Sequence, residues 1–292
     1  MPRNLIIVRA GDKSLHTGWL GNQQERNFDV IVNYYDDNPD LYRDQGQRRI
    51  DSKSTKWPAL HKLIGELMPE LDAYDYIWLP DDDLASDMQN VNRLFDICRD
   101  YKMDLAQPGL TPDSIIGNAV TLRNRSFLLR YTNFVEIMAP CFSLPFLKKC
   151  WPTFTANRSG YGLDYVWPRM TDNPFKIGII DACLVKHTQS RGPSYDIYKA
   201  DGIVVEEEYK ALLIKEKIRP LPLIYGGIDW AGNQNTLWNG GHQQLIRSIM
   251  AGYLPEMGQH SETLFQIIAP LLGFVGATPS MPPDPPLPMA KG

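Results

Sequence analysis

Residues 76–83 read Tyr-Ile-Trp-Leu-Pro-Asp-Asp-Asp, an apolar run followed one residue later by three carboxylates. The run 76–79 has the length of a strand, and similar continuous apolar runs occur at 5–8 and 30–33. Such runs are typical of central strands that are covered on both faces of a sheet. The sequence therefore predicts three buried strands, the third delivering acidic side chains at its carboxyl end.

Helical periodicity separates and follows these strands. Apolar residues recur at spacings of three and four over 57–68 and again over 91–101, where Ser86 or Asp87 is a candidate N-cap. Further helical patterns cover 206–218 and 245–250. Alternation of strand and helix predicts an α/β fold with a mixed, mostly parallel central sheet flanked by helices, followed by a helical C-terminal extension.

Composition narrows the class of protein. The chain has 292 residues, 43% of them hydrophobic and 22% charged, with a formal net charge of -4. These values exclude a disordered or coiled-coil chain, and no overall positive charge attracts nucleic acid, so none is expected as a partner. The cysteines, Cys98, Cys141, Cys150 and Cys183, lack the Cys-x-x-Cys spacing of zinc or redox sites, and we expect reduced, buried thiols.

The two ends carry little targeting information. The apolar run near the N-terminus stops at Arg9, which is too short for a signal peptide. Residues 264–277 are apolar but interrupted by Pro270 and Gly273, and a spanning helix needs about 20 residues. We expect a cytoplasmic protein in which residues 256–292, an apolar segment and a proline-rich tail, offer at most peripheral membrane contact.

The acidic triplet has two interpretations. Asp81, Asp82 and Asp83 raise one another's pKa unless a positive charge lies among them, and Mg²⁺ or Mn²⁺ is a suitable partner for carboxylate oxygens. Ligands of open α/β sheets also bind at the carboxyl ends of strands. The alternative is a solvated acidic turn that caps the following helix.

Three further residues are candidates for the same site. His187 ends the strand-like run 177–187, where an imidazole can complete a metal site or simply lie at the surface. Asp164 follows Gly160 and Gly162, which suits a general base close to a substrate or a glycine turn before a helix. Glu136 lies in the strand-like run 135–138 and is either a rival base or a structural carboxylate paired with an arginine.

These residues together resemble the nucleotide-sugar-dependent glycosyltransferases of the GT-A fold, which is Rossmann-like. More closely, they resemble a plant and bacterial family catalogued as a domain of unknown function. The resemblance covers roughly residues 50–190 and rests on the segments 74–84, 104–108, 135–143, 160–164 and 177–187. The middle position of the acidic triplet is usually glutamate in that family and is Asp82 here.

The resemblance implies roles for individual positions. Asp83 binds a cation, Asp81 contacts the cation, the ribose or both, and His187 is the later metal ligand. Asp164 matches the acidic position that faces the acceptor and serves as base in inverting members, with Glu136 as its rival. The donor is expected over the ends of the first strands, near Arg9, Asp36, Lys56 and Asp82.

The sequence thus predicts a glycosyltransferase dependent on Mn²⁺ or Mg²⁺, moving a sugar from a nucleotide-sugar donor, by family habit a UDP-sugar, to a glycan or glycoconjugate acceptor. Residues 1–195 form the nucleotide-sugar and acceptor domain, and 196–255 the helical extension. Two alternatives stay open: a phosphatase of the haloacid-dehalogenase type, which also uses Asp-x-Asp and Mg²⁺, and a non-catalytic nucleotide-sugar binding module.

Overall fold

The computed structural model describes residues 4–43, 48–189, 198–238, 241–256 and 260. Its strands are β1 (Asn4–Ala10), β2 (Asp29–Tyr34), β3 (Arg48–Asp51), β4 (Tyr76–Trp78), β5 (Leu84–Ala85), β6 (Leu105–Leu110), β7 (Phe127–Thr132), β8 (Cys141–Ser143), β9 (Ile177–His187), β10 (Ile224–Asp229) and β11 (Gln234–Thr236). Its α-helices are α1 (Lys56–Leu71), α2 (Met88–Asp100), α3 (Leu144–Cys150), α4 (Leu163–Val166), α6 (Val205–Lys215) and α7 (His242–Tyr253). The predicted strands at 5–8, 30–33 and 76–79 and the helices at 57–68 and 91–101 are confirmed, and Asp87 caps α2.

One mixed sheet organises the described part of the chain, in the order β11-β10-β7-β9-β6-β8-β4-β1-β2-β3. The first half, β4-β1-β2-β3, is parallel, as the sequence predicts. The second half departs from the expected mostly parallel sheet, because β8 lies antiparallel between β4 and β6, and β7 pairs antiparallel with β9. Strands β7 and β8 thus flank the parallel pair of β9 and β6, and both run in the opposite direction to that pair.

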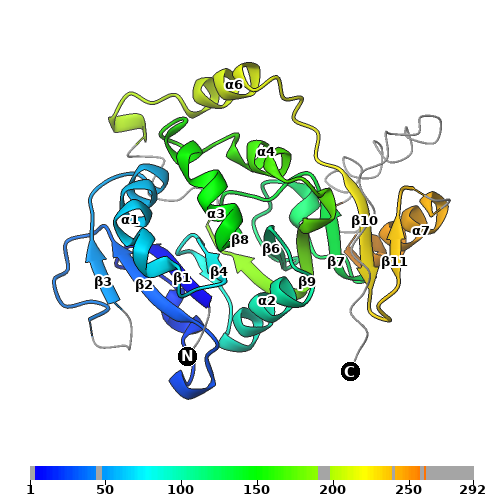
Figure 1. The fold of residues 1–292 in the computed structure, drawn as a ribbon, viewed down its shortest axis with the longest axis horizontal. Helices are drawn as coiled ribbons and strands as arrows, with labels where there is room; N and C mark the ends of the chain where they lie inside the picture. Colours follow the sequence, from blue (N-terminus) through cyan, green and yellow to red (C-terminus); the bar gives the residue numbers. More distant parts are fainter. Residues whose placement is uncertain (1–3, 44–47, 190–197, 239–240, 257–259, 261–292) are drawn as a thin grey trace.

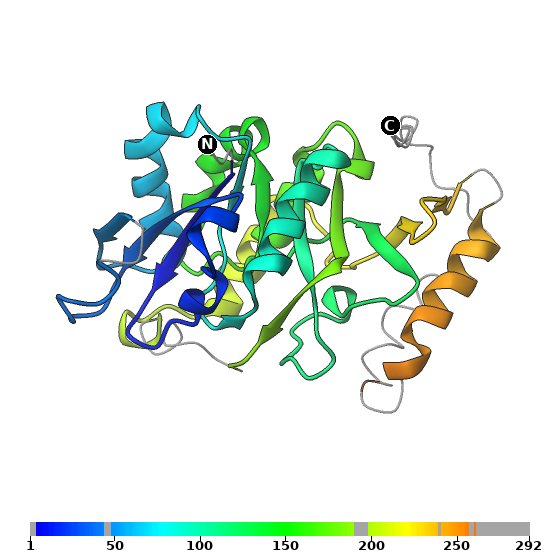
Figure 2. The same cartoon turned by 90° about the horizontal axis from the view of Figure 1, so that it is seen from below.

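Helices cover both faces of this sheet (Figures 1 and 2). On β1, Ile6 and Val8 belong to the core under α2, whereas Leu5 and Ile7 belong to the core that contains residues of α1 and α3. Successive side chains of a strand point to opposite faces, so a continuous apolar run must be covered on both sides. This three-layer arrangement explains why β1 is fully buried.

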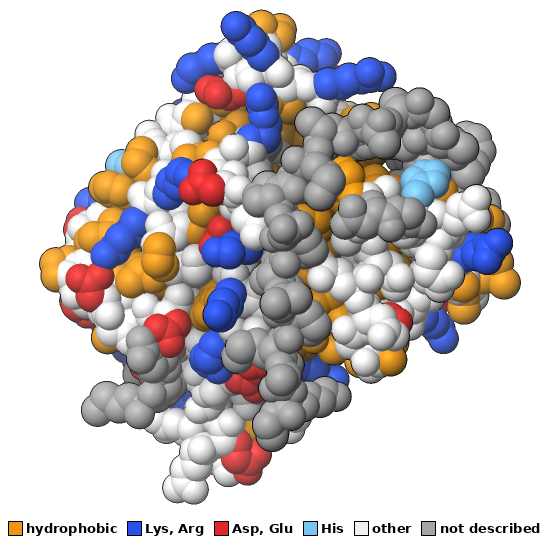
Figure 3. Space-filling model, turned by 45° about the vertical axis from the view of Figure 1, so that its right-hand side comes forward, with side chains coloured by type: hydrophobic (Ala, Val, Ile, Leu, Met, Phe, Trp, Pro, Cys, Tyr) orange, Lys and Arg blue, Asp and Glu red, His pale blue; other side chains and the backbone are white. Residues whose placement is uncertain are grey.

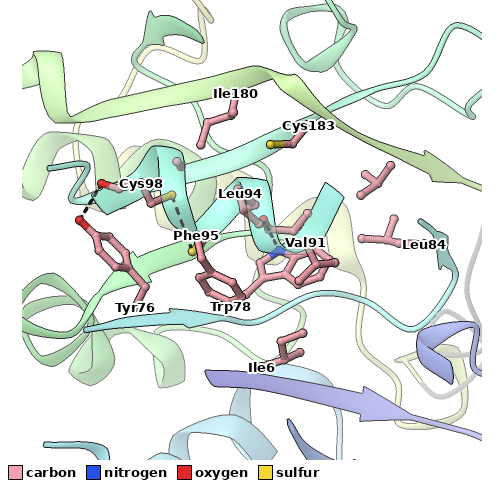
Figure 4. Packing of buried hydrophobic residues seen from close by; sticks show 14 of the residues in the cluster. Ile6, Tyr76, Trp78, Leu84, Val91, Leu94, Phe95, Cys98, Ile180 and Cys183 are labelled. Atoms are coloured by element: carbon pink, nitrogen blue, oxygen red, sulfur yellow. Dashed lines mark hydrogen bonds between the residues drawn. The ribbon is translucent and has the colours of Figure 1, made fainter. Parts of the chain in front are cut away.

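The core beneath α2 combines aromatic, aliphatic and cysteine side chains (Figure 4). Trp78 of β4 is fully buried, and its indole N–H donates to the carbonyl of Ala139 at 3.0 Å. The four cysteines are free and buried, as expected, and the Sγ atoms of Cys98 and Cys141 lie 4.0 Å apart. Close packing of this layer fixes β4, and with it the position of the acidic residues that follow.

Residues 196–255 are more than a helical extension. They supply α6 and α7, but also β10 and β11, and β10 pairs antiparallel with β7 and extends the main sheet. Their attachment includes Arg130 of β7, whose fully buried guanidinium lies 2.7 Å from Asp181 of β9 and also donates to the hydroxyl of Tyr253 in α7. The C-terminal part is therefore integrated with the sheet.

One loop differs from the sequence prediction. The strand-like run 135–138 does not form a strand; it lies in a turn closed by the Ala139 N–H donating to the Glu136 carbonyl at 3.2 Å.

The face in Figure 3 carries both acidic and basic side chains, with Lys and Arg gathered at the end where α6 lies. Within the described ranges, no helix has the length and hydrophobicity that a bilayer span requires. The apolar segment 264–277 and the proline-rich tail lie outside the described residues.

Candidate functional site

Backbone pairing between β5 and β9 brings Asp83 and His187 together. Leu84 pairs with His187 in register, and the N–H of Thr188 donates to the Asp83 carbonyl at 3.2 Å. As a result, Nε2 of His187 lies 3.4 Å from Oδ2 of Asp83. Two side chains from distant parts of the sequence therefore meet at one point because a short antiparallel bridge joins their strands.

The charges of this pair reinforce each other. Burial lowers the pKa of His187, but the hydrogen bond and negative charge of Asp83 outweigh it and raise that pKa to about 9. The Nδ1 atom lies 2.7 Å from the Ile115 carbonyl, which fixes the ring. Asp83 is only 7% exposed, and its Oδ1 is buried without a hydrogen-bond partner. An unpaired buried carboxylate oxygen is costly, which marks this oxygen as a candidate ligand atom.

Asp81 forms an ion pair with Lys56, the first residue of α1. The ammonium of Lys56 donates to Oδ1 of Asp81 at 2.5 Å and to the Ile137 carbonyl at 2.8 Å. Desolvation raises the pKa of Asp81, as does Asp83, while Lys56 and His187 lower it. The Asp81 side chain keeps 39% of its surface exposed. It therefore remains accessible to a ligand, although its charge is already matched by a lysine.

The carboxyl ends of β1 and β2 form the adjoining part of the site. The N–H of Gly11 donates to Oδ2 of Asp82 at 2.7 Å, and burial raises the pKa of Asp82 to about 6. A Cβ at Gly11 would lie 2.6 Å from the hydroxyl of Tyr35 and 2.7 Å from Oδ2 of Asp36, so both side chains approach this backbone closely. Arg9 stacks on Tyr35, with 5.1 Å from the guanidinium carbon to the ring centre.

The guanidinium of Arg9 is held by hydrogen bonds to other groups of the protein. Its guanidinium donates to Oδ1 of Asn33 at 2.6 Å and to the carbonyls of Ser52 and Ser54. Burial lowers its pKa to about 10, so it remains cationic at neutral pH. The structure thus gives Arg9 a structural role in joining β1, β2 and the segment before α1, and its positive charge still lies near Asp82.

Asp164 lies in the first turn of α4, after two glycines with left-handed backbone. Gly160 has a φ of +81° and Gly162 a φ of +98°, which other residues adopt only with strain. Asp164 is 9% exposed, its Oδ1 has no hydrogen-bond partner, and burial raises its pKa to about 8. The carboxyl group is therefore protonated at neutral pH and becomes a strong base once ionised.

Glu136 completes the acidic cluster from the loop after β7. Its backbone N–H donates to Oε1 of Gln107 at 2.6 Å, and its Oε2 is buried without a partner. Burial raises its pKa to about 7, with His187 lowering it and Asp81 raising it. No ion pair with an arginine involves Glu136 among the described residues, so the alternative of a structural pair finds no support there.

Asp83 and His187 form the part of this cluster that fits a divalent cation. Oxygen donors and a neutral imidazole suit Mg²⁺ and Mn²⁺, so His187, whose pKa is raised to about 9, must release its Nε2 proton to bind either ion. The unpaired Oδ1 of Asp83 offers a free lone pair. Over residues 4–43, 48–189, 198–238, 241–256 and 260, no group of three or more His, Cys, Asp or Glu side chains is arranged to bind a metal. The predicted trio of Asp81, Asp83 and His187 is thus assembled as one close pair, with Asp81 turned to Lys56.

Several residues near the site escaped the sequence analysis. Tyr198 is buried and lies near Asp81 and Arg9. Gln107 orients the loop of Glu136, and Glu208 of α6 accepts hydrogen bonds from the segment before Asp164. The Gln107 and Glu208 contacts are made to backbone groups far away in sequence, which no spacing or periodicity reveals.

The fold and site define an α/β protein with a carboxylate-rich cluster at the carboxyl ends of β1 and β4 and the tip of β9. Residues 6–132 match the family described as "Protein of unknown function (DUF707)". This match supports the resemblance to a family catalogued as a domain of unknown function, although it begins and ends earlier than the motifs at 50–190. No curated protein matches the chain.

Solved structures similar to this chain include nucleotide-sugar enzymes. Residues 1–349 of S. aureus TarS in complex with UDP-GlcNAc are 12% identical, with a TM-score of 0.46 and coverage of 94% of this chain and 73% of that chain. Glucosyl-3-phosphoglycerate synthase from Mycobacterium tuberculosis, in complex with Mn²⁺, UDP-glucose and phosphoglyceric acid, is 12% identical, with a TM-score of 0.44 and coverage of 80% and 86%. In another S. aureus TarS structure, 10% identical with a TM-score of 0.43, the match covers 68% of this chain and 38% of that chain. At these values the function of this chain must be argued from its own side chains.

Proposed function

We propose that the protein is a metal-dependent glycosyltransferase that moves a sugar from a nucleotide-sugar donor, a UDP-sugar, to a hydroxyl of a glycan or glycoconjugate acceptor. One observation carries the proposal. Buried carboxylate oxygens without partners on Asp83, Glu136 and Asp164 lie in one cluster with His187, at the edge of the sheet where α/β proteins bind ligands.

The donor side of the proposed site is the edge formed by β1, β2 and the acidic triplet. Asp83 and His187 would hold Mn²⁺ or Mg²⁺, with Asp81 beside them, and a bound cation would act as a Lewis acid on the diphosphate. Lys56 places an ammonium group next to Asp81, where it would also attract phosphate oxygens of a bound donor. Asp36 and Asp82 lie against Gly11, and both residues, together with Arg9, are proposed to contact the base and ribose.

The acceptor side is formed by Asp164 and Glu136. In an inverting reaction a carboxylate takes the proton of the attacking hydroxyl, which typically contributes about 10² to 10⁴-fold. Asp164 suits this role because burial raises its pKa to about 8, so that its ionised form is a strong base. Glu136, whose pKa burial raises to about 7, is the second candidate, and its negative charge adds to the burial that raises the pKa of Asp164.

The first test is ligand binding by thermal shift. UDP with Mn²⁺ should raise the melting temperature of the wild-type protein, because a ligand that binds only the folded state stabilises it by mass action. Asp83→Asn should abolish this shift, whereas Asp100→Asn, an exposed residue at the end of α2, should retain it. Absence of any response to nucleotides, with or without Mn²⁺, would contradict the proposal.

Turnover separates the proposal from its two alternatives. UDP release from a UDP-sugar, lost in Asp83→Asn and strongly reduced in Asp164→Asn, would support a transferase. Binding without any hydrolysis or transfer would indicate a binding module. Mg²⁺-dependent hydrolysis of p-nitrophenyl phosphate that beryllium fluoride inhibits would instead indicate the phosphatase.

A further inference from the structure

Helix α6 places one carboxylate against the backbone that leads to Asp164. Oε1 of Glu208 accepts from the N–H of Arg158 at 3.2 Å, and Oε2 accepts from the N–H of Ser159 at 2.9 Å. Two consecutive backbone donors are thus bound by the two oxygens of one side chain. Hydrogen bonds to a charged acceptor are roughly twice as strong as neutral ones, so this contact is a strong restraint on residues 158 and 159.

The restrained segment continues directly into α4. A Cβ at Gly160 would lie 1.9 Å from Cδ1 of Trp57, so the loop is pressed against the start of α1. A Cβ at Gly162 would lie 3.0 Å from Leu212, which shows that α6 also packs on the second turn of the loop. In Figure 1, α6 lies above α4, in agreement with these contacts. The loop is therefore held between α1 and α6.

Asp164 depends on this loop for its position. The N–H groups of Tyr165 and Val166 donate to the Gly162 carbonyl at 3.1 and 3.2 Å, which forms the turn that carries Asp164. Only a few peptide units separate residues 158 and 159 from Asp164, so a displacement of their backbone also displaces Asp164. Misplacement of a reacting group by about 1 Å can lower a rate by about 10²-fold.

We propose that Glu208 is a positioning residue that holds the loop 157–162, and through it Asp164, in the geometry needed on the acceptor side of the site. The inference rests on the proposed function for the part played by Asp164. It adds a residue from outside the matched region and outside the motif segments. It also assigns α6 to the acceptor side of the site.

The same helix supplies a matched control. Glu207, the residue preceding Glu208, is exposed, and among the described residues its carboxylate forms no hydrogen bond or ion pair, while its backbone N–H donates to the Val204 carbonyl at 3.0 Å. Glu206 lies 3.1 Å from Lys210 in an ordinary helical ion pair. Glu207→Ala therefore removes a carboxylate from α6 without touching the loop, whereas Glu208→Ala removes both acceptors and Glu208→Gln keeps one.

The first experiment measures backbone hydrogen exchange over residues 157–166. In Glu208→Ala, the amides of Arg158, Ser159, Tyr165 and Val166 should exchange at least 10-fold faster than in the wild type. Glu208→Gln should give an intermediate rate, and Glu207→Ala the wild-type rate. Faster exchange restricted to residues 158 and 159, or none, overturns the proposal. The exchange rates do not depend on activity. If Glu208→Ala fails to fold, Glu208→Gln, which keeps one acceptor oxygen, provides the same test of the loop.

The second experiment separates kcat from the donor KM. Glu208→Ala should lower kcat for transfer by at least 10-fold while the KM for the nucleotide sugar changes less than twofold, and Glu208→Gln should recover part of kcat. Equal kcat in Glu208→Ala and Glu207→Ala overturns the positioning role. A wild-type protein that transfers no sugar refutes the proposed function, and the exchange rates at Tyr165 and Val166 then still show whether Glu208 positions the turn.

Discussion

Replacement of Asp164 by asparagine should flatten the pH dependence of stability. The pKa of Asp164 rises from an ordinary 3.8 to about 8 on folding, because the carboxyl group is buried. Between pH 5 and pH 7 the unfolded chain has released this proton while the folded chain retains it. The free energy of unfolding of the wild type therefore falls by about 1.4 kcal/mol per pH unit from this one group.

The expected magnitude follows from that slope. Over two pH units, Asp164 alone removes about 2.7 kcal/mol from the wild-type protein, whereas Asp164→Asn has no proton to lose. The contribution is fully present below pH 4 and is lost as the pH rises through about 8. Glu136, with a pKa raised to about 7, adds a slope of the same sign that both proteins share.

Urea unfolding at pH 5, 6, 7 and 8 measures the effect. The difference in unfolding free energy, variant minus wild type, should increase by about 2.7 kcal/mol from pH 5 to pH 7. The exposed control Asp100→Asn should follow the wild-type curve. Parallel curves for the wild type and Asp164→Asn would show that Asp164 ionises normally in the folded protein, and the argument for its role as a strong base would fail.

Three further predictions concern other parts of the structure. Asp83→Asn removes the carboxylate that raises the pKa of His187 to about 9, so an NMR titration should give a value at or below 6.5, and an unchanged value would contradict the pair. Arg130→Met leaves the fully buried Asp181 without its cation and should cost about 3–5 kcal/mol in urea unfolding; a loss below 1 kcal/mol would show that the pair matters little. Gly160→Ala forces a Cβ into Trp57 at a left-handed position and should destabilise the protein by at least about 2 kcal/mol more than Gly202→Ala, which shares positive φ but meets no atom within 4 Å. Equal losses in the two glycine variants would refute the contact.

The sequence predicted the elements whose pattern is local. The strands at 5–8, 30–33 and 76–79 were recognisable because each is a continuous apolar run, and α1 and α2 because one face of each is apolar. Strand β10 was not recognisable, because Ile224–Asp229 contains Gly226 and Gly227 and follows two prolines. It forms because β7 offers an edge against which only small residues fit: a Cβ at Gly227 would lie 2.6 Å from the Phe127 ring.

In the candidate site, too, local sequence patterns marked some residues, whereas other contacts depend on tertiary packing. Asp83 and His187 could be singled out because each lies at the end of a strand-like run, and the bridge between β5 and β9 then brings them together. The sequence could not predict that Asp81 pairs with Lys56 or that Arg9 donates hydrogen bonds to backbone carbonyls. Both contacts depend on how α1 and the segment before it pack against the sheet. Their roles in ligand binding stay predictions.

Strand β10 has a practical consequence for anyone shortening this chain. It occupies the hydrogen-bonding side of β7 along its whole length, from Phe127 to Thr132. A truncation before Ile224 would leave the backbone donors and acceptors of β7 open to a second molecule, the usual starting point of aggregation through sheet edges. Expression boundaries should therefore fall beyond Tyr253 of α7, whose hydroxyl accepts a hydrogen bond from Arg130 of β7.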